Sequence, residues 1–411
     1  MRFRTAIIWS GISQFGISGI TLLSTIILAR MLTPDDFAII GIVTIFIAFS
    51  QMMVDSEMGG ALLRKKTVDR TDYSTLFYYN LVVSFGLYAV LYLCAPLIAD
   101  FYNLTSLTEI VRVISLTIII HAFRVVQKIM LFRDLKFKVY AVINVISGLV
   151  SLGLAIWLAY LDYGYWALVW QQIAFAVANV ILMEGYNRFI PAWTFSKASF
   201  KYQFSFGISL LGSDTVRTIA NNISTNIIAK LASLEFTGYY TQTSRITGFC
   251  QSSIGSLMDQ SVFPMLSKYE SVEEIRATYY RILRLLCIGL IAITVGFILF
   301  ARPIILIVLG EKWLPAIWVF QILSLAILPT TVQVLCRNIL KTLAATRKVL
   351  YLETVKSVIV ISLLALAAFI STASVVWSLV VSQSISCIIW IIATGKELKK
   401  VIDRNQGLPQ I

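Results

Sequence analysis

The chain has 411 residues, of which 58% are hydrophobic and 13% charged, with a formal net charge of +13 and a mean hydropathy of +0.83. A soluble domain is usually about 45–50% apolar and about 25% charged, because its surface must face water, so this composition excludes an ordinary soluble protein. The basic residues lie mainly between apolar segments, and we expect a membrane protein with no nucleic-acid partner.

Apolar runs of about 20 residues, the length of helix that crosses a bilayer core, recur along the whole chain. In chain order they cover residues 5–29, 37–58, 74–98, 107–131, 138–160, 164–186, 204–230, 236–262, 279–301, 314–338, 348–371 and 375–395. We therefore predict an all-α integral membrane protein of about twelve transmembrane helices. The first run has the basic start of a signal peptide, but it is too long and lacks a small-residue cleavage site, so we expect a retained helix.

A short charged break separates the first two runs, from Arg30 to Asp36. Pro34 cannot continue the first helix, because it has no backbone N–H and its ring clashes with the preceding turn. Asp35 or Asp36 is suited to accept the free amide hydrogens at the start of the next helix. The break is therefore predicted to be a turn between two transmembrane helices.

The basic residues are distributed unevenly between the two sides of the membrane. Connections after the even-numbered helices and the two termini carry most of the lysines and arginines, whereas the opposite connections carry few. The basic clusters contain Arg64, Lys65, Lys66 and Arg70; Arg133, Lys136 and Lys138; Arg347 and Lys348; and Lys396, Lys399 and Lys400. Because cytoplasmic connections are enriched in Lys and Arg, we expect both termini to be cytoplasmic.

Similar stretches recur in the two halves of the chain. The matched positions are Ala29 with Ala229, Arg30 with Lys230, Arg112 with Gln321, Lys128 with Arg337, Lys138 with Arg347, Trp166 with Trp377 and Gln172 with Gln383. Each half has an even number of predicted helices, so both enter the membrane with the same polarity and the repeat is parallel. Two parallel six-helix bundles around a central cleft are an architecture of alternating-access transporters.

The repeat divides the chain into a six-helix lobe at 1–190, a linker at 191–203, a second six-helix lobe at 204–398 and a cytoplasmic tail at 399–411. Around the linker, Trp193, Phe195 and Phe200 alternate with Lys197 and Lys201, which suits a segment lying at the inner headgroup layer. An ordinary cytoplasmic linker with interfacial aromatic residues explains the same pattern.

Two sequence stretches carry a resemblance to a known family. ARMLTPDDFAIIGIVTIF at 29–46 and GGALLRKK at 59–66 look like the opening of the polysaccharide transporter family, the Wzx-type flippases. These belong to the superfamily that includes multidrug extrusion proteins and the lipid II flippase. The resemblance implies a bacterial inner-membrane protein that moves an undecaprenyl-diphosphate-linked oligosaccharide to the outer leaflet by alternating access, for O-antigen, exopolysaccharide or teichuronic acid synthesis. It also implies a polysaccharide polymerase and chain-length proteins as partners.

A diphosphate substrate gives a role to cations within the predicted helices, where a charge costs about 2.5–3.5 kcal/mol on insertion scales and tends to face a cavity. Guanidinium groups bind phosphate oxygens with paired hydrogen bonds. The candidates are Arg245, Arg217, Arg124 and Lys128. Alternatives are an ion pair between Arg217 and Asp214, three residues apart, and extension of the Arg124 and Lys128 side chains to the inner surface.

Other polar residues in the predicted helices are candidates for contacts with sugars or with a coupling ion. Gln14, Asn221, Asn222 and Asn226 are suited to hydrogen-bond sugar hydroxyls, although small polar residues also pack helices together. Asp214 and Asp55 are candidates for coupling to H⁺ or Na⁺. We expect no other cofactor and no metal site, because the cysteines are isolated in apolar segments and His121 is the one histidine.

Three other functions compete with this hypothesis. A membrane enzyme such as a polysaccharide polymerase needs a large outside loop or a His/Asp constellation, and neither is seen, so we expect no enzyme. An ion-coupled drug or cation extruder favours an acidic chamber, whereas the cations above are mainly arginine. A lipid II flippase also requires a cationic cleft and is less well separated by sequence.

Overall fold

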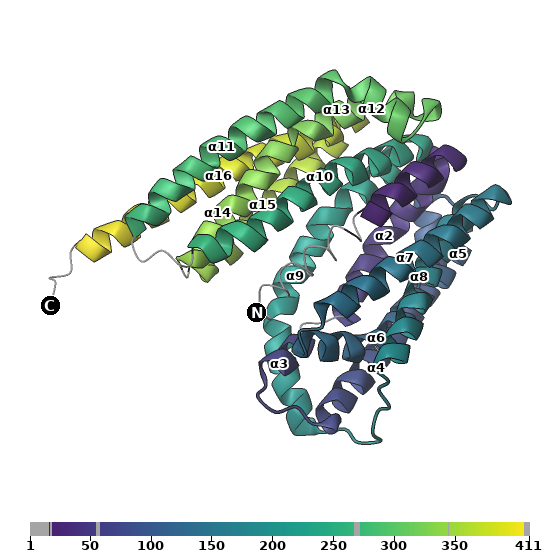
Figure 1. Ribbon diagram of the computed structural model, residues 1–411. Helices are drawn as coiled ribbons and strands as arrows, with labels where there is room; N and C mark the ends of the chain where they lie inside the picture. The colour runs from purple at the N-terminus through teal and green to yellow at the C-terminus, as the bar shows by residue number, and fades with distance from the viewer. Residues whose placement is uncertain (1–15, 17–18, 55–57, 267–271, 344, 407–411) are drawn as a thin grey trace. The chain divides into compact units, whose positions relative to one another are not determined.

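A computed structural model describes residues 16, 19–54, 58–266, 272–343 and 345–406. Within these ranges the chain forms helices and short connections, without a β-strand (Figure 1). The chain divides into two compact units, Met1–Gly238 and Tyr239–Ile411. The all-α fold class predicted from the composition is confirmed.

Unit 1 is built around α2, whose apolar residues are buried along most of its length. A helix at Gly19–Met31 comes before it. The labelled helices are α2 (Pro34–Val54), α3 (Met58–Arg64), α4 (Arg70–Tyr102), α5 (Ser106–Ile114), α6 (Leu116–Arg133), α7 (Phe137–Tyr160), α8 (Tyr165–Tyr186) and α9 (Lys197–Leu231). Helix α2 packs against α4, α6, α8 and α9, while α7 packs mainly against α8.

The turn before α2 has the structure of a reciprocal helix cap. The Asp36 carboxylate accepts hydrogen bonds from the Thr33 backbone N–H at 2.8 Å and from the Thr33 hydroxyl at 2.7 Å. In return, the Asp36 backbone N–H donates to the Thr33 hydroxyl oxygen at 3.4 Å. Thr33 is therefore the capping residue, with Pro34 at the first helical position, and Asp36 completes the cap rather than forming it alone.

Gly238 is required where α10 begins. A Cβ atom at this position would lie 2.0 Å from the carbonyl oxygen of Pro34, so the two backbones approach more closely than any other residue allows. This contact lies within unit 1 and fixes the end of that unit against the start of α2.

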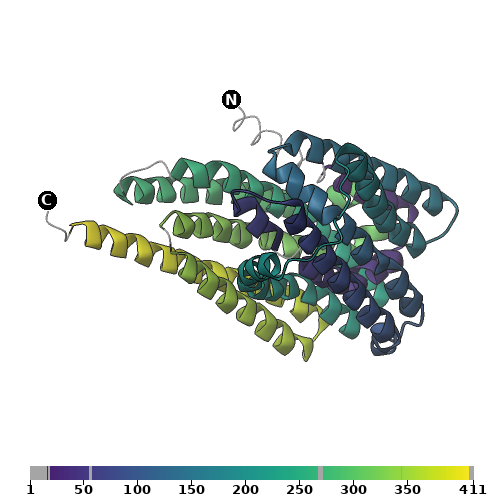
Figure 2. The ribbon, with the colours of Figure 1, turned by 90° about the horizontal axis from the view of Figure 1, so that it is seen from below.

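Unit 2 contains the remaining helices. They are α10 (Leu234–Leu266), which starts at the end of unit 1, α11 (Val272–Leu299), α12 (Ala301–Val308), the 3₁₀ helix η1 (Glu311–Ala316), α13 (Ile317–Leu325), α14 (Ile327–Thr342), α15 (Thr346–Ala368) and α16 (Thr372–Gln406). Helix α16 runs beside α11, α14 and α15 (Figures 1 and 2). The core of unit 2 includes Tyr279, Leu335, Trp390, Cys336 and Cys387. Cys336 and Cys387 are therefore core residues, as predicted.

Among the described residues, the predicted segments from 37–58 onward are largely helical, and two of them are divided between consecutive helices well inside the segment. The segment 107–131 is divided at Ser115, between α5 and α6, and the segment 314–338 is divided at Ala326, between α13 and α14. At the first break, the Ile118 N–H donates to the Ser115 carbonyl three residues back, at 3.0 Å. When the two halves are aligned by the repeat, the two breaks fall within two residues of each other. This agreement supports the predicted relation between the halves.

Eight helices of the described chain are long and apolar enough to cross a membrane. Large apolar side chains on α4 and α15, including Leu93, Leu97 and Leu366, are exposed, as lipid contact requires. The chain is therefore a multi-pass membrane protein. The count of twelve stays a prediction, because most of segment 5–29 lies outside the described residues.

The division into lobes at 1–190 and 204–398 also stays a prediction. Helix α9 starts at Lys197, seven residues earlier than the predicted segment, because the Ser196 hydroxyl accepts the Ser199 backbone N–H at 3.2 Å and caps the helix. Helix α9 packs against α2, α3 and α4 and belongs to unit 1 by its contacts.

Candidate functional site

Helix α6 carries two of the predicted phosphate-binding cations, Arg124 and Lys128, one turn apart. Both side chains are half-buried, and α6 packs against α2, α3, α4 and α8. The Nε atom of Arg124 is buried and has no hydrogen-bond partner among the described residues. An unsatisfied buried N–H costs about 1–3 kcal/mol, and a role of Arg124 in binding an anion stays a prediction.

The third cation near this end of α6, Arg133, has a structural role. Its guanidinium donates to the carbonyl oxygens of Leu62 and Lys65 at 2.7 and 2.8 Å, and to that of Lys66 at 2.7 Å. These carbonyls lie at and just after the end of α3, where they lack partners within the helix. Arg133 therefore ties α3 to α6.

Helix α6 also contacts α8 through a polar pair that the sequence analysis did not identify. The Gln127 amide donates to the Glu184 carboxylate, which also accepts the Phe189 backbone N–H at 3.2 Å. His121, on the same helix, is buried. The side chain of Glu184 is thus held by neutral donors beside the cations of α6.

The predicted residues of α9 are described only in part. The backbone at Asp214, Arg217 and Asn221 is helical, but their side chains lie outside the described part of the structure, as do Gln14 and Asp55. The Asn222 amide donates to the Thr218 carbonyl at 2.8 Å.

Asn226 contacts a neighbouring helix. Its side-chain oxygen accepts the Tyr102 hydroxyl hydrogen at 2.7 Å, and its amide donates weakly to the Asn222 carbonyl at 3.4 Å. Both asparagines are therefore used in helix structure and packing, and a sugar contact by either of them stays a prediction.

Arg245 lies in the part of α10 that belongs to unit 2, and it is half-buried. Polar side chains surround it along the helix, among them the buried Thr241, Thr243 and Thr247. Gln242 is fully buried, and neither atom of its side-chain amide has a hydrogen-bond partner among the described residues. A helix segment with this polarity differs from the lipid-facing surface of α4 and favours an interior position, and a contact between Arg245 and a ligand stays a prediction.

Unit 2 also contains a charged cluster that the sequence analysis missed. The Glu353 carboxylate on α15 lies 3.7 Å from the Arg337 guanidinium of α14 and 3.7 Å from the Lys356 ammonium. A second pair joins Lys348 of α15 to Glu397 of α16. The spacing of Glu353 and Lys356 was visible in the sequence, whereas Arg337 was recognised only as the repeat partner of Lys128.

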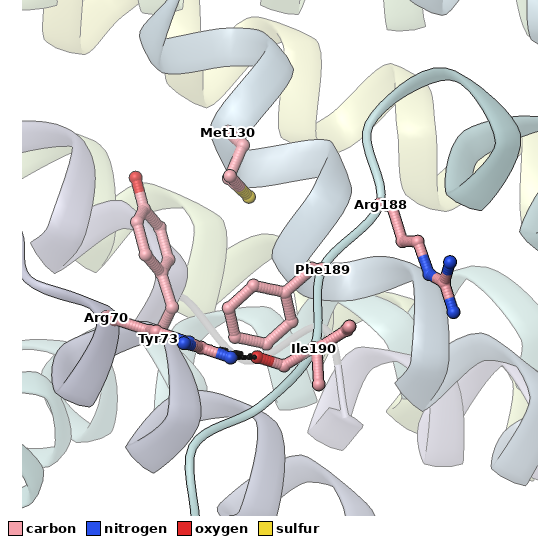
Figure 3. Close-up of a pocket in the computed structure, with 6 residues that line it drawn as sticks. All are labelled: Arg70, Tyr73, Met130, Arg188, Phe189 and Ile190. Carbon is pink, nitrogen blue, oxygen red and sulfur yellow. Dashed lines mark hydrogen bonds between the residues drawn. The ribbon is translucent and has the colours of Figure 1, made fainter.

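A hollow of about 370 Å³ lies in unit 1, between the start of α4, the end of α6 and the connection that follows α8. Its lining residues are Arg70, Tyr73, Met130, Arg188, Phe189 and Ile190 (Figure 3). Arg70 donates two hydrogen bonds to the Ile190 carbonyl oxygen, at 3.1 Å from Nε and 2.8 Å from Nη2. Sequence reasoning missed this site because its walls come from three separate segments.

Sequence comparisons give the chain a family. A family model described as "Polysaccharide biosynthesis protein" matches residues 27–318. The teichuronic acid biosynthesis protein TuaB of Bacillus subtilis is 25% identical over 321 residues, which is 77% of this chain and 66% of TuaB. The lipopolysaccharide biosynthesis protein WzxC of Escherichia coli is 21% identical over 322 residues, 77% of this chain and 65% of WzxC. The match thus spans slightly less than two thirds of each relative.

Solved structures show the same fold. An inward-facing multidrug transporter of the MATE family and MOP superfamily has a TM-score of 0.75 at 15% identity, covering 93% of this chain and 95% of its own. The lipid II flippase MurJ in an inward closed conformation has a TM-score of 0.76 at 14% identity, and the match covers 98% of this chain and 94% of MurJ. At these identities the likeness concerns the fold alone, and it confirms the extrusion-transporter-like fold expected from the sequence.

Proposed function

Because the chain belongs to the polysaccharide biosynthesis protein family, we propose that it is a flippase for a lipid-linked oligosaccharide. The substrate is an oligosaccharide on undecaprenyl diphosphate, which the protein moves from the inner to the outer leaflet of the bacterial cytoplasmic membrane. The family match over residues 27–318 carries this proposal. The names of TuaB and WzxC, which refer to teichuronic acid and lipopolysaccharide biosynthesis, support a surface polysaccharide as the end product.

The cations within the helices support an anionic substrate. A diphosphate that leaves water loses strong hydration, and charge-assisted hydrogen bonds from Arg or Lys offset this loss at about 1.5–3 kcal/mol each. Arg124 has a buried donor atom without a described partner, and Lys128 follows one turn later. With Arg217 and Arg245, these residues form the proposed diphosphate-binding set.

Transport is proposed to occur by alternating access of two lobes, with both termini in the cytoplasm. The basic residues at the α3–α4 and α6–α7 connections, including Lys65, Lys66 and Lys136, support this orientation by the positive-inside rule. Asp214 and Asp55 remain the candidates for coupling to H⁺ or Na⁺. The protein acts as a carrier rather than as an enzyme, and a polymerase with chain-length proteins uses the delivered substrate.

A second candidate function is extrusion of drugs or cations, favoured by the fold likeness to a MATE transporter. A lipid II flippase is the third candidate, from the likeness to MurJ. The cations of α6 argue against a cationic substrate, because like charges in a low-dielectric site repel strongly.

The test is transport by the purified full chain in proteoliposomes. We expect movement of a polyprenyl-diphosphate oligosaccharide between leaflets and no uptake of a cationic dye. Dye transport without lipid movement would replace the proposal by the extruder function. Transport of lipid II at an equal or higher rate would favour the third candidate.

Arg245→Ala is expected to abolish polysaccharide export in cells while the protein still inserts at its normal level, because the diphosphate loses a guanidinium partner. Surface polysaccharide is measured alongside protein in the membrane fraction. Arg347→Ala, which removes an exposed arginine of α15, is the matched control and should export normally. Normal export by Arg245→Ala would remove this residue from the proposed set.

A further inference from the structure

The connection between α8 and α9, residues 187–196, is non-helical and is held along the first turns of α4. Arg70 binds the Ile190 carbonyl oxygen, and the Ala192 backbone N–H donates to the Ser74 hydroxyl at 2.8 Å. The Ser196 N–H donates to the Thr75 hydroxyl at 3.1 Å. This surface segment therefore has a fixed path and can form one wall of a binding site.

The hollow beside this connection combines two guanidinium groups with apolar and aromatic walls. Arg70 and Arg188 lie on opposite sides of the Phe189 ring (Figure 3). The Tyr73 and Phe189 rings meet edge to face, with centroids 6.1 Å apart. Pockets for small ligands are typically about 300–1,000 Å³, and at about 370 Å³ this hollow falls within that range.

The charges at this site favour an anion. No carboxylate is among the lining residues. Two nearby carboxylates are paired with lysines, Asp72 with Lys65 at 2.6 Å and Asp134 with Lys136 at 3.1 Å, and Glu184 accepts hydrogen bonds from Gln127 and Phe189. Arg188 is exposed and makes no hydrogen bond or ion pair among the described residues, so its charge is available to a ligand.

The surface around the hollow is apolar and aromatic as well as basic. Trp193 is 96% exposed, Ile190 56%, Phe195 52% and Tyr202 48%. Lys197 and Lys201 lie exposed beside them. Exposed aromatic rings with lysines are typical of the membrane–water interface, where the ring reaches the acyl boundary and the ammonium group meets lipid phosphate.

We propose that this hollow binds the headgroup of an anionic phospholipid of the inner leaflet. The phosphodiester lies against the exposed guanidinium of Arg188, and the acyl chains continue over Ile190 and the exposed ring of Trp193 into the lipid beside α4. A soluble anion would leave the apolar side chains of this surface exposed, whereas the acyl chains of a lipid cover them. The bound lipid stabilises the connection that leads into α9. The choice of the inner leaflet rests on the orientation given with the proposed function, whereas binding of the lipid does not depend on transport.

The test uses the full chain purified in uncharged detergent. Phosphatidylglycerol, phosphatidylcholine and inorganic phosphate are added separately, and the thermal unfolding midpoint is measured together with lipid retention by native mass spectrometry. We expect phosphatidylglycerol to raise the midpoint and to be retained, with no rise from phosphatidylcholine. An equal rise with inorganic phosphate would overturn the assignment to a lipid and leave a soluble-anion site.

Arg188→Gln is expected to weaken phosphatidylglycerol binding about tenfold, because one charge-assisted contact is lost. Arg188 has no described structural contact, so the variant should fold. Arg347→Gln removes an equally exposed arginine from unit 2 and should bind lipid as the wild type does. Equal loss in both variants, or unchanged binding in Arg188→Gln, would overturn the site. Trp193→Ser should reduce lipid retention without changing any response to phosphate.

Discussion

The sequence repeat pairs α6 with α14, yet the helices that follow them, α7 and α15, carry different polar groups at matched positions. The register that pairs Lys128 with Arg337 and Lys138 with Arg347 also pairs Asn144 with Glu353 and Ser147 with Lys356. In unit 2, Glu353 lies 3.7 Å from both Arg337 and Lys356. The cation of α14 therefore faces a carboxylate supplied by the next helix.

In unit 1 the equivalent positions of α7 form a neutral network instead. The Asn144 amide donates to the Tyr140 carbonyl at 2.7 Å, and its side-chain oxygen accepts from the Asn179 amide of α8 at 3.0 Å. Ser147 donates to the Ile143 carbonyl at 2.8 Å. Helix α7 thus offers amides and hydroxyls where α15 offers a carboxylate.

We infer from this difference that one helical framework serves two purposes. A carboxylate beside a buried guanidinium neutralises it and ties two helices together, which is a structural use. At the position of unit 1 that the repeat pairs with Glu353, the amide of Asn144 keeps a helix contact without adding a carboxylate there. We therefore expect the cations of α6 to act in transport and Arg337 to act in stability.

The largest expected effect comes from removing both cations of α6. Arg124→Ala combined with Lys128→Ala should lower polysaccharide export at least about a hundredfold, because two charge-assisted hydrogen bonds of about 1.5–3 kcal/mol each are lost. Export is measured against protein in the membrane. Arg337→Gln combined with Glu353→Gln removes the ion pair of unit 2 and should export nearly normally. An equal loss of export in both double variants would show that the cations of the two units do not differ in function.

A smaller effect is expected when the carboxylate of unit 2 is introduced into unit 1. Asn144→Asp places a charge at a position that is 3% exposed, where no cation takes part in the described hydrogen bonds. An uncompensated buried charge costs about 3 kcal/mol or more, so the midpoint of chemical unfolding in detergent should fall clearly. The reciprocal substitution Glu353→Gln should lower the stability less than Asn144→Asp does. A stable Asn144→Asp protein would show that α7 already has a cation to receive the carboxylate.

The smallest expected effect concerns the ion pair of unit 2. Arg337→Glu or Glu353→Arg alone should destabilise the protein by about 2 kcal/mol, between the values for exposed and buried pairs. The double exchange Arg337→Glu with Glu353→Arg should recover most of this loss. At the control pair of Lys348 and Glu397, the double exchange should likewise recover most of the stability that either single exchange loses there. Stability is followed by thermal unfolding. If the Arg337–Glu353 exchange restores stability but abolishes export, Arg337 would have to be assigned to the substrate as well.

The helices were largely predictable because an apolar run of about 20 residues has few alternatives in a membrane. The breaks at Ser115 and Ala326 were not, since the apolar sequence continues through both. The start of α9 was missed because the cap at Ser196 lies in a stretch that reads as a linker.

The candidate site was less predictable, because its geometry depends on which helices meet. Sequence alone placed Arg124 and Lys128 on one face of a helix. It used Arg133 only as one of the basic residues that indicate the cytoplasmic side, whereas in the structure this residue binds α3. The hollow beside Arg188 required three segments to be brought together. For Arg217, Asp214 and Asn221 the side-chain positions lie outside the described structure, and their roles stay predictions.

The three carbonyl contacts of Arg133 have a mechanical consequence. Helix α3 has only seven residues, and its C-terminal end is bound to the same helix that carries Arg124 and Lys128. A displacement of α6 during the transport cycle would therefore pull the chain at 62–66 along with it. A spectroscopic label on exposed Lys66 would report the movement of the cation-bearing helix from outside the path of the substrate.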